Sequence, residues 1–274
     1  MLPRSFTAIP SVTVTCQPHE SGQSWWHVPF TTVVLIIPRL DTTGPRTVGR
    51  FPVVSSEIVS HPLAAILERA AHGDFPAADG ESDIMPADDD GTFAVVSFTG
   101  HAVVLADVDP AHIAAKLGGG GGFGGALAPD VVQWLAGTDR AIGSIDVVLV
   151  ANGSGRGEST LNPGNDHLGH SRVQRALGHR RDVQVHANDD GLAIVGRGLV
   201  GRRELSVELF RPDGTPAGAG RRLIDAGRAL IPTGELCWAQ VASGNTRSLR
   251  AFLAAGFVPV CSEVLISHRE DDQR

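Results

Sequence analysis

The spacing of apolar residues changes twice within the last forty or so residues of the chain. The stretches 235–241 (ELCWAQV) and 257–266 (FVPVCSEVLI) are short and apolar, which predicts two strands. The helix predicted between them has apolar residues three and four positions apart, at Leu249, Phe252 and Leu253. Gly256 stands where a helix commonly ends in the left-handed conformation, and Phe257 is placed to fold back onto the last turn.

A strand and a helix are also predicted about thirty residues upstream. Residues 203–210 (RELSVELF) predict a strand, and residues 215–231 (TPAGAGRRLIDAGRALI) predict a helix. Thr215 is a good N-cap and Pro216 a good first helical residue. The apolar stripe of this helix consists of Leu223, Ala226 and Leu230.

Two glycines, Gly218 and Gly220, lie in the first turn of that predicted helix. A side chain at either position would obstruct a group approaching the main-chain amides. The first turn of a helix carries unpaired N–H groups and the positive end of the helix dipole, which together favour a bound pyrophosphate. Taken alone, the two glycines are explained equally well by close packing of the helix against a sheet.

The elements preceding residue 203 complete a regular order. Residues 171–178 predict a short helix, and strands at 182–187 and 192–200 are joined by the turn at 188–191. Asn-Asp-Asp-Gly between two apolar runs is a clear hairpin signal. From residue 171 onward the predicted order is helix, three strands, helix, strand, helix, strand.

This order and two motifs resemble the GNAT superfamily of acyl-CoA N-acyltransferases. The family motif Gln/Arg-x-x-Gly-x-Gly/Ala reads here Thr215-Pro-Ala-Gly218-Ala-Gly220, so the glycines match and the leading Gln/Arg does not. The second family motif is an Asn, a small residue three positions on, an aromatic four further, and Gly-Phe. Here these residues are Asn245, Ser248, Phe252 and Gly256-Phe257.

The resemblance covers about residues 165–268 and implies a fold class and a set of binding residues. It implies an α/β (α+β) fold with a mixed, mostly antiparallel sheet flanked by helices. Residues 144–151 (SIDVVLVA) would supply the first strand of the family order. The main chain of Leu209 and Phe210, together with Asn245 and Ser248, would contact the pantetheine arm of acetyl-CoA. The pyrophosphate would be held by the amides of Ala217, Gly218, Ala219, Gly220 and Arg221.

By the same resemblance, an acetyl group would pass from acetyl-CoA to a primary amine by direct attack. The amine must first lose a proton, and family carboxylate bases come from the strand at 203–210, where Glu204 and Glu208 are the candidates. Each is equally well explained as a solvent-exposed strand carboxylate. The family's Tyr acid is replaced by Phe252, and the chain contains no Tyr. The alternatives are therefore a non-catalytic acyl-CoA-binding or regulatory module, or a GNAT half that is purely structural.

The resemblance leaves the first half of the chain to the hydrophobic pattern. Residues 1–28 predict a disordered N-terminus with one short strand at 12–15, and residues 29–151 predict a smaller α/β region. Its elements are strands at 31–37, 93–98, 102–108 and 144–151, helices at 62–72, 110–116 and 129–136, and a loop at 76–91. A degenerate second GNAT copy is one interpretation of it. Residues 152–169 predict a linker to a GNAT domain at 170–268.

One segment of that region, 118–125 (GGGGGFGG), resembles a phosphate loop in composition. No predicted strand leads into it, and no Lys-Ser/Thr follows it. A flexible loop is therefore the prediction.

Composition narrows the classes of partner. The formal net charge of −7 argues against nonspecific nucleic-acid binding, which needs a basic surface. The longest strongly apolar run, near 32–37, is too short to span a bilayer, and the N-terminus lacks the pattern of a signal peptide. A cytoplasmic protein that contacts no membrane and accepts a small-molecule or protein amine is expected, with a homodimer contact as a further option.

The candidate metal ligands do not form a recognised set. Cys16, Cys237 and Cys261 have no metal-ligand spacing and are expected to be reduced thiols, buried in the protein. The clustered histidines are His167, His170, His179 and His186. No carboxylate or cysteine completes a site with them, so no metal is predicted.

Overall fold

The computed structural model describes residues 60–155, 160–211 and 217–269, all within one compact unit. The helices are α1 Pro62–Ala71, α2 Pro110–Leu117, α3 Pro129–Ala136, α4 Ser171–His179, α5 Ala219–Arg228 and α6 Thr246–Ala254, with 3₁₀ turns η1 Gly125–Leu127, η2 Asn165–His167 and η3 Leu199–Gly201. The predictions for 1–28 and 31–37, and for Thr215 and Pro216, lie outside the described residues.

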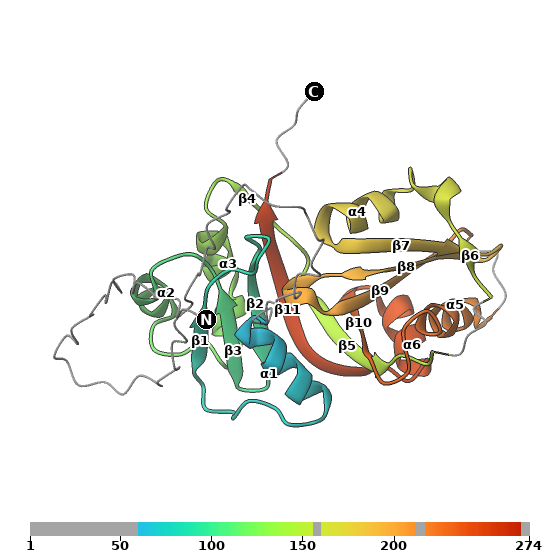
Figure 1. Ribbon diagram of the computed structural model, residues 1–274. Coiled ribbons are helices and arrows are strands. Elements are labelled where there is room, and N and C mark those ends of the chain that lie inside the picture. Colours follow the sequence, from blue (N-terminus) through green and yellow to red (C-terminus); the bar gives the residue numbers. More distant parts are fainter. Residues whose placement is uncertain (1–59, 156–159, 212–216, 270–274) are drawn as a thin grey trace, which may run out of the picture. The chain divides into compact units, whose positions relative to one another are not determined.

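The described strands form one mixed sheet (Figure 1). They are β1 Ser82–Met85, β2 Phe93–Phe98, β3 His101–Leu105, β4 Arg140–Ile142, β5 Asp146–Asn152, β6 Asn162–Pro163, β7 Arg181–Ala187, β8 Gly191–Arg197, β9 Arg203–Leu209, β10 Leu236–Ala242 and β11 Val258–His268. Their order is β1-β3-β2-β11-β5-β10-β9-β8-β7-β6, with β4 paired to β11. The β1–β3 and β9–β10 pairs are parallel and the others are antiparallel. The predicted fold class, a mixed and mostly antiparallel sheet flanked by helices, is confirmed.

Strand β5 occupies a different place from the one expected for it. Its residues were predicted to supply the first strand of the family order, directly before α4 and β7, but β5 pairs with neither β7 nor β8. Instead β5 pairs antiparallel with β10 on one side and with β11 on the other. Val147 and Leu149 pack into the core on one face of the sheet, and Val148 and Val150 into the core on the other. A strand that is apolar on both faces is most stable in the interior of a sheet, which explains its position.

The sheet is continuous across the predicted linker. β5 precedes residues 152–169 and β10 follows them, yet the two strands are paired over seven residues, from Leu236 opposite Asn152 to Ala242 opposite Asp146. The predicted linker itself contains β6 and η2. Whether the regions on either side fold as separate domains stays a prediction.

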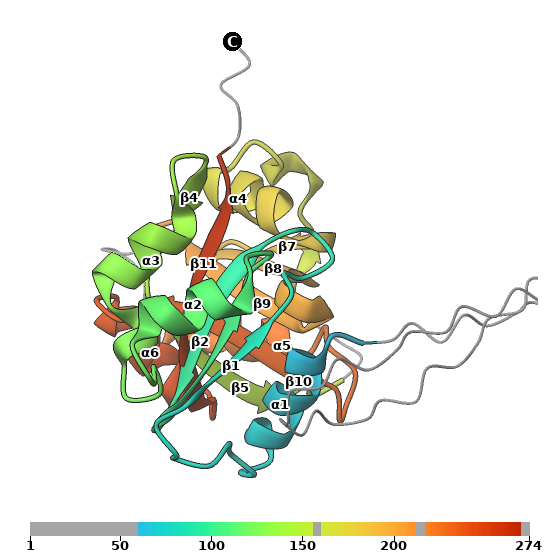
Figure 2. The ribbon, with the colours of Figure 1, turned by 90° about the vertical axis from the view of Figure 1, so that its left-hand side faces the viewer.

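The helices cover both faces of this sheet. Helices α5 and α6 pack with one face of β5, β8, β9 and β10, and α2 and α3 lie on the same face farther along. On the opposite face, α1 packs Leu63 and Leu67 against β2, β3, β5 and β11, and α4 packs Val173 and Ala176 against β8. Figure 2 shows α1 and α3 on opposite sides of strands β1–β3. We call the side covered by α1 and α4 the α4 face.

The end of α6 confirms the pattern read from the sequence. Gly256 is left-handed at φ +84°, the Phe257 N–H donates to Phe252 O, and the Gly256 N–H donates to Leu253 O. These are the two hydrogen bonds of a Schellman motif. The Phe252 and Phe257 rings meet edge to face, with centroids 5.0 Å apart. The spacing places Leu253 on the same helical face as Phe252, but Leu253 lies at the edge of that face and is 44% exposed.

Two predictions for the first half of the chain also need correction. The predicted loop at 76–91 contains β1, which pairs parallel with β3 and is specified by that pairing rather than by its own mixed composition. The glycine-rich segment 118–125 packs closely on its neighbours, since a Cβ at Gly122 would lie 2.5 Å from Gly100 O. These glycines therefore permit a close approach of two main-chain segments.

Candidate functional site

Strands β9 and β10 diverge in the middle of the sheet. They are parallel and share one registered pair, Trp238 opposite Glu204. On their outer sides, by contrast, β9 pairs with β8 over seven residues and β10 pairs with β5 over seven residues. Beyond the Trp238–Glu204 pair, the facing edges of β9 and β10 therefore have no registered partner in each other. Unpaired main-chain groups of this kind are available to bind a ligand.

The N-terminus of α5 lies at this divergence. The helix begins at Ala219, not at residue 215 as predicted, and Gly218 is its N-cap with φ +83°. Gly220, in the first turn, lies near Leu209 of β9 and Ala251 of α6. A Cβ added at Gly220 would be 3.8 Å from a carbon of each, which is ordinary contact. The packing of the protein therefore does not require glycine at position 220, whereas a ligand close to the amides would.

The remaining predicted pyrophosphate residues surround the same turn. Ala217 and Gly218 precede the helix, and Ala219 and Arg221 follow within it. Arg222 donates from Nη1 to Ala217 O at 3.2 Å and so closes the turn from the side. The structure brings these residues together with Gly220 and Leu209. Their contact with a pyrophosphate stays a prediction.

The predicted pantetheine contacts have structural partners of their own. The Asn245 side chain accepts from the Ser248 N–H at 3.1 Å and so caps α6. The Phe210 N–H donates to Asp190 O at 3.0 Å, which leaves its carbonyl for other partners. Ser248 is half-buried at the start of α6. The roles of these residues toward acetyl-CoA remain predictions.

On the α4 face, Glu204 belongs to a buried ion-pair network. Its carboxylate receives Arg202 and Arg180, each at 2.7 Å, and the residue is 1% exposed. Arg202 also forms a bidentate pair with Glu263 of β11, and Gln240 donates to the same carboxylate. Burial alone would raise the pKa of Glu204, but Arg180 and Arg202 outweigh it and lower the pKa. A carboxylate held in this way is a weak proton acceptor.

Glu208 is the more accessible of the two predicted bases. Its side chain is 37% exposed, and Oε2 lies 2.9 Å from Nη2 of Arg172 on α4. It alternates along β9 with Ser206, whose hydroxyl accepts from Arg180 at 3.1 Å. The structure therefore places Glu204, Ser206 and Glu208 on one face of the sheet. Their catalytic roles stay predictions.

The sequence reasoning missed a third carboxylate on this face, Asp146 at the start of β5. Asp146 lies opposite Ala242 of β10 and Glu263 of β11. Burial raises its pKa above the usual value, and a hydrogen bond from Ser144 at 2.7 Å acts in the opposite direction. Its strand is apolar at four successive positions, 147–150, so the sequence did not show which way the carboxylate points.

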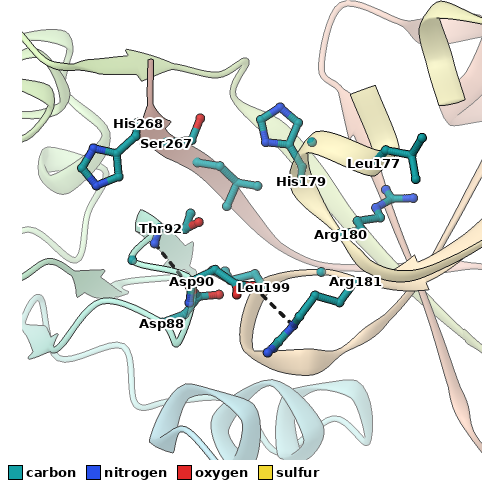
Figure 3. A pocket seen from close by; sticks show the side chains of 14 residues that line it. Asp88, Asp90, Thr92, Leu177, His179, Arg180, Arg181, Leu199, Ser267 and His268 are labelled. Atoms are coloured by element: carbon teal, nitrogen blue, oxygen red, sulfur yellow. Dashed lines mark hydrogen bonds and ion pairs between the residues drawn. The ribbon is translucent and has the colours of Figure 1, made fainter. Parts of the chain in front are cut away.

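A polar cavity of about 310 Å³ lies beside this network, between the loop before β2, the end of α4 and the end of β11 (Figure 3). Asp90 and Arg181 form an ion pair across it at 3.4 Å. Arg180 lines the cavity and also reaches Glu204 and Ser206. The Arg180 side chain therefore connects the cavity to Glu204 on the α4 face.

Backbone strain is concentrated next to the cavity. Among the described residues, the non-glycine positions with positive φ are Asp182 (φ 52°) and Val200 (φ 49°). Each directly follows a residue that lines the cavity, Arg181 and Leu199. A left-handed β-branched residue is costly, and such strain is commonly found at functional sites.

The order of elements in the second half of the chain agrees with the order predicted from its sequence. Helix α4, strands β7 to β9, helix α5, β10, α6 and β11 follow the order expected from the sequence, and β9 and β10 diverge between α5 and α6. In this half of the chain, the order of helices and strands is therefore the one that the sequence resemblance implies. No protein-family model matches the chain, and no curated protein matches it.

Three solved structures are similar to parts of the chain. One is described as an acetyltransferase of the GNAT family from Novosphingobium aromaticivorans, with 18% identity over 48% of this chain and 69% of that one and a TM-score of 0.32. A GCN5-related N-acetyltransferase from Kribbella flavida has 12% identity, coverages of 53% and 66%, and a TM-score of 0.32. A GNAT-family acetyltransferase from Colwellia psychrerythraea has 12% identity, coverages of 48% and 59%, and a TM-score of 0.29.

Other predicted features can be placed on the fold. Cys237 and Cys261 are both buried, in cores on opposite faces of the sheet, and burial raises the pKa of Cys237 to about 12. Trp238 is buried in the core. In the described part of the chain, no group of His, Cys, Asp or Glu is arranged to hold a metal ion. Within the same residues, no helix is long and apolar enough to span a membrane.

Proposed function

We propose that this protein transfers an acetyl group from acetyl-CoA to a primary amine. The observation that carries the proposal is the divergence of β9 and β10, which share one registered pair beside the glycine-bearing N-terminus of α5. A long thioester fits this arrangement, with its pyrophosphate at the α5 amides and its pantetheine arm between the strands. The space that a Cβ would occupy at Gly220 suits a ligand close to those amides.

The two faces of the sheet would then serve the two substrates. The α5 and α6 side would hold acetyl-CoA, and the amine would approach from the α4 face, where the carboxylates and the cavity of Figure 3 lie. Holding the amine nitrogen against the thioester carbonyl supplies much of the rate by raising the effective concentration. Main-chain N–H groups at the edge of β9 would polarise that carbonyl.

The reaction itself needs one proton acceptor on the α4 face. The ammonium loses a proton, the free amine attacks the thioester carbon, the C–S bond breaks, and the CoA thiolate leaves. A second proton passes from the nitrogen to solvent as the amide forms, and the thiolate takes up a proton from solvent or a hydroxyl. Ser243, just before α6, and Ser248, half-buried at its start, are the candidate hydroxyls.

A non-catalytic acyl-CoA-binding or regulatory module is the second candidate function. It is favoured by Phe252, which occupies the place of the family's Tyr acid and is buried against Phe257. Such a module would use the same α5 site and would not release thiol.

Binding of acetyl-CoA, measured by calorimetry, tests both candidates. Gly220→Asp places a carboxylate against the pyrophosphate, and Gly220→Asn is its neutral match in size. We expect Gly220→Asp to weaken binding about tenfold more than Gly220→Asn, since tenfold corresponds to about 1.4 kcal/mol of repulsion. Absence of binding by the wild-type chain would overturn the proposal. Binding without thiol release across a panel of amines would favour the non-catalytic module.

A further inference from the structure

We propose that Asp146, at the start of β5, is the group that accepts the proton of the amine substrate. This inference rests on the proposed function and names the proton acceptor that the function requires. Glu204 and Glu208 were the candidates visible in the sequence, and Asp146 replaces them on the basis of position, partners and surroundings.

Position is the first reason. Val148 and Val150 point into the core on the α4 face, so Asp146, which alternates with them, is on that face as well. Asp146 is opposite Ala242, the last residue of β10. Ala242 lies four residues beyond Trp238, the residue of β10 registered with β9, and therefore at the end where the two strands diverge. The amine would approach the thioester from the same face and at the same end.

The second reason is the difference in partners among the carboxylates of this face. Glu204 and Glu263 are buried and are neutralised by Arg180 and Arg202, and Glu208 is paired with Arg172. Among the described residues, Asp146 forms no ion pair, and its hydrogen bond is the one from Ser144. A partly buried carboxylate that forms no ion pair reduces stability, and a binding site for a substrate ammonium explains why the chain retains one there.

The third reason is the charge around Asp146. Glu263 of β11 and Glu204 of β9 face it and raise its pKa, while Arg175 of α4 and the Ser144 hydroxyl lower it, and burial has the largest effect, upward. The raised pKa makes the carboxylate a better proton acceptor than a solvent-exposed aspartate. In the reaction, one proton passes from the ammonium to Asp146, and Asp146 returns it to solvent after the amide has formed.

Asp146→Asn separates this role from a structural one. We expect acetyl-CoA affinity within about twofold of wild type and a loss of amine-dependent thiol release of about a hundredfold or more. The melting temperature should be equal to or higher than that of wild type at pH 7. Because folding raises the pKa of Asp146, the charged carboxylate lowers the free energy of unfolding at pH values above that raised pKa. The loss disappears below the ordinary pKa of 3.8, where the carboxyl group is protonated in both the folded and the unfolded state. Asp74→Asn, on an exposed turn, serves as the control for a charge change away from the site.

The pH profile of kcat/KM provides the second measurement. Activity should rise with pH as Asp146 ionises, and Asp146→Asn should lose this limb while Glu208→Gln keeps it. Ser144→Ala removes a hydrogen bond that lowers the pKa of Asp146, so the limb should move to higher pH. An unchanged limb in Asp146→Asn, or its loss in Glu208→Gln, would overturn the assignment of Asp146. A wild-type chain that binds acetyl-CoA but acylates no amine would overturn the proposed function, and with it any proton acceptor.

Discussion

At the scale of single residues, the buried Arg202 is the centre of the charge network on the α4 face. It joins Glu204 of β9 to Glu263 of β11, and each of the three residues is less than a tenth exposed. Burial alone would lower the pKa of Arg202, but the two carboxylates raise it. The guanidinium therefore remains charged, and both carboxylates are needed to offset the cost of burying that charge.

Removal of one partner should consequently be costly. Glu263→Ala leaves Arg202 with one carboxylate and leaves Gln240 without its acceptor. We expect a loss of about 3 to 5 kcal/mol in the free energy of unfolding, measured by urea denaturation. The reason is that removing one partner of a buried pair leaves a buried charge, here part of that on Arg202, without compensation. Glu81→Ala, an exposed carboxylate, is the control and should change stability little. A loss under about 1 kcal/mol for Glu263→Ala would contradict the network as described.

At the scale of elements, helix α5 carries two interior glycines with different surroundings. A Cβ at Gly227 would lie 2.6 Å from Leu205 Cδ1, and a Cβ at Gly220 would meet nothing closer than 3.8 Å. Gly227 is therefore required by packing of α5 against β9, whereas Gly220 is free for a ligand. The sequence motif includes Gly220 and does not include Gly227.

Alanine at each position should separate packing from binding. Gly220→Ala should leave the protein as stable as wild type or about 1 kcal/mol more stable, since alanine favours helix, and should weaken acetyl-CoA binding. Gly227→Ala should lose about 1 to 3 kcal/mol of stability through overcrowding, and the folded protein should keep its affinity. Thermal denaturation and calorimetry on both variants give the comparison. Equal effects of the two variants on binding would argue against a ligand at the first turn of α5.

At the scale of the whole molecule, the sheet depends on both halves of the chain. β5 lies between β10 and β11, and residues of α1, β2, β5 and β11 share one core. The predicted GNAT domain at 170–268 lacks β5 and therefore has two strands with no partner between them. Separated strands expose main-chain groups and apolar surface that the complete sheet covers.

The isolated segment 170–268 should therefore not fold. We expect no cooperative thermal transition for it by circular dichroism, in contrast to residues 60–274. Mixing it with a 60–155 segment should restore a transition, because that segment supplies β5 and the α1 side of the core. A cooperative transition in 170–268 alone would show that the boundary predicted at 152–169 separates two domains.

Much of the candidate site was predictable where local signals specify local structure. The Gly256-Phe257 end of α6, the hairpin between β7 and β8 and the glycines at the start of α5 each depend on a few neighbouring residues. The start of α5 was placed too early because Gly218, in the left-handed conformation, caps the helix later than Thr215 would have done. Leu253 was assigned to the buried face because spacing alone does not set the width of the contact.

The sequence by itself determined most of the segments that form helices and strands, because spacing, caps and turns act over a few residues. Strand β1, in the predicted loop, is specified instead by its pairing with β3. It also determined the order of elements from residue 171 onward and the resemblance that this order carries. The tertiary structure decided where β5 lies, since a strand apolar on both faces can be central beside several partners. It also decided which carboxylates are neutralised and which is not. The carboxylates of Glu204, Glu208 and Glu263 are paired with Arg172, Arg180 and Arg202. Among the described residues, Asp146 of this face forms no ion pair. Such pairing depends on long-range contacts, and no local pattern encodes them.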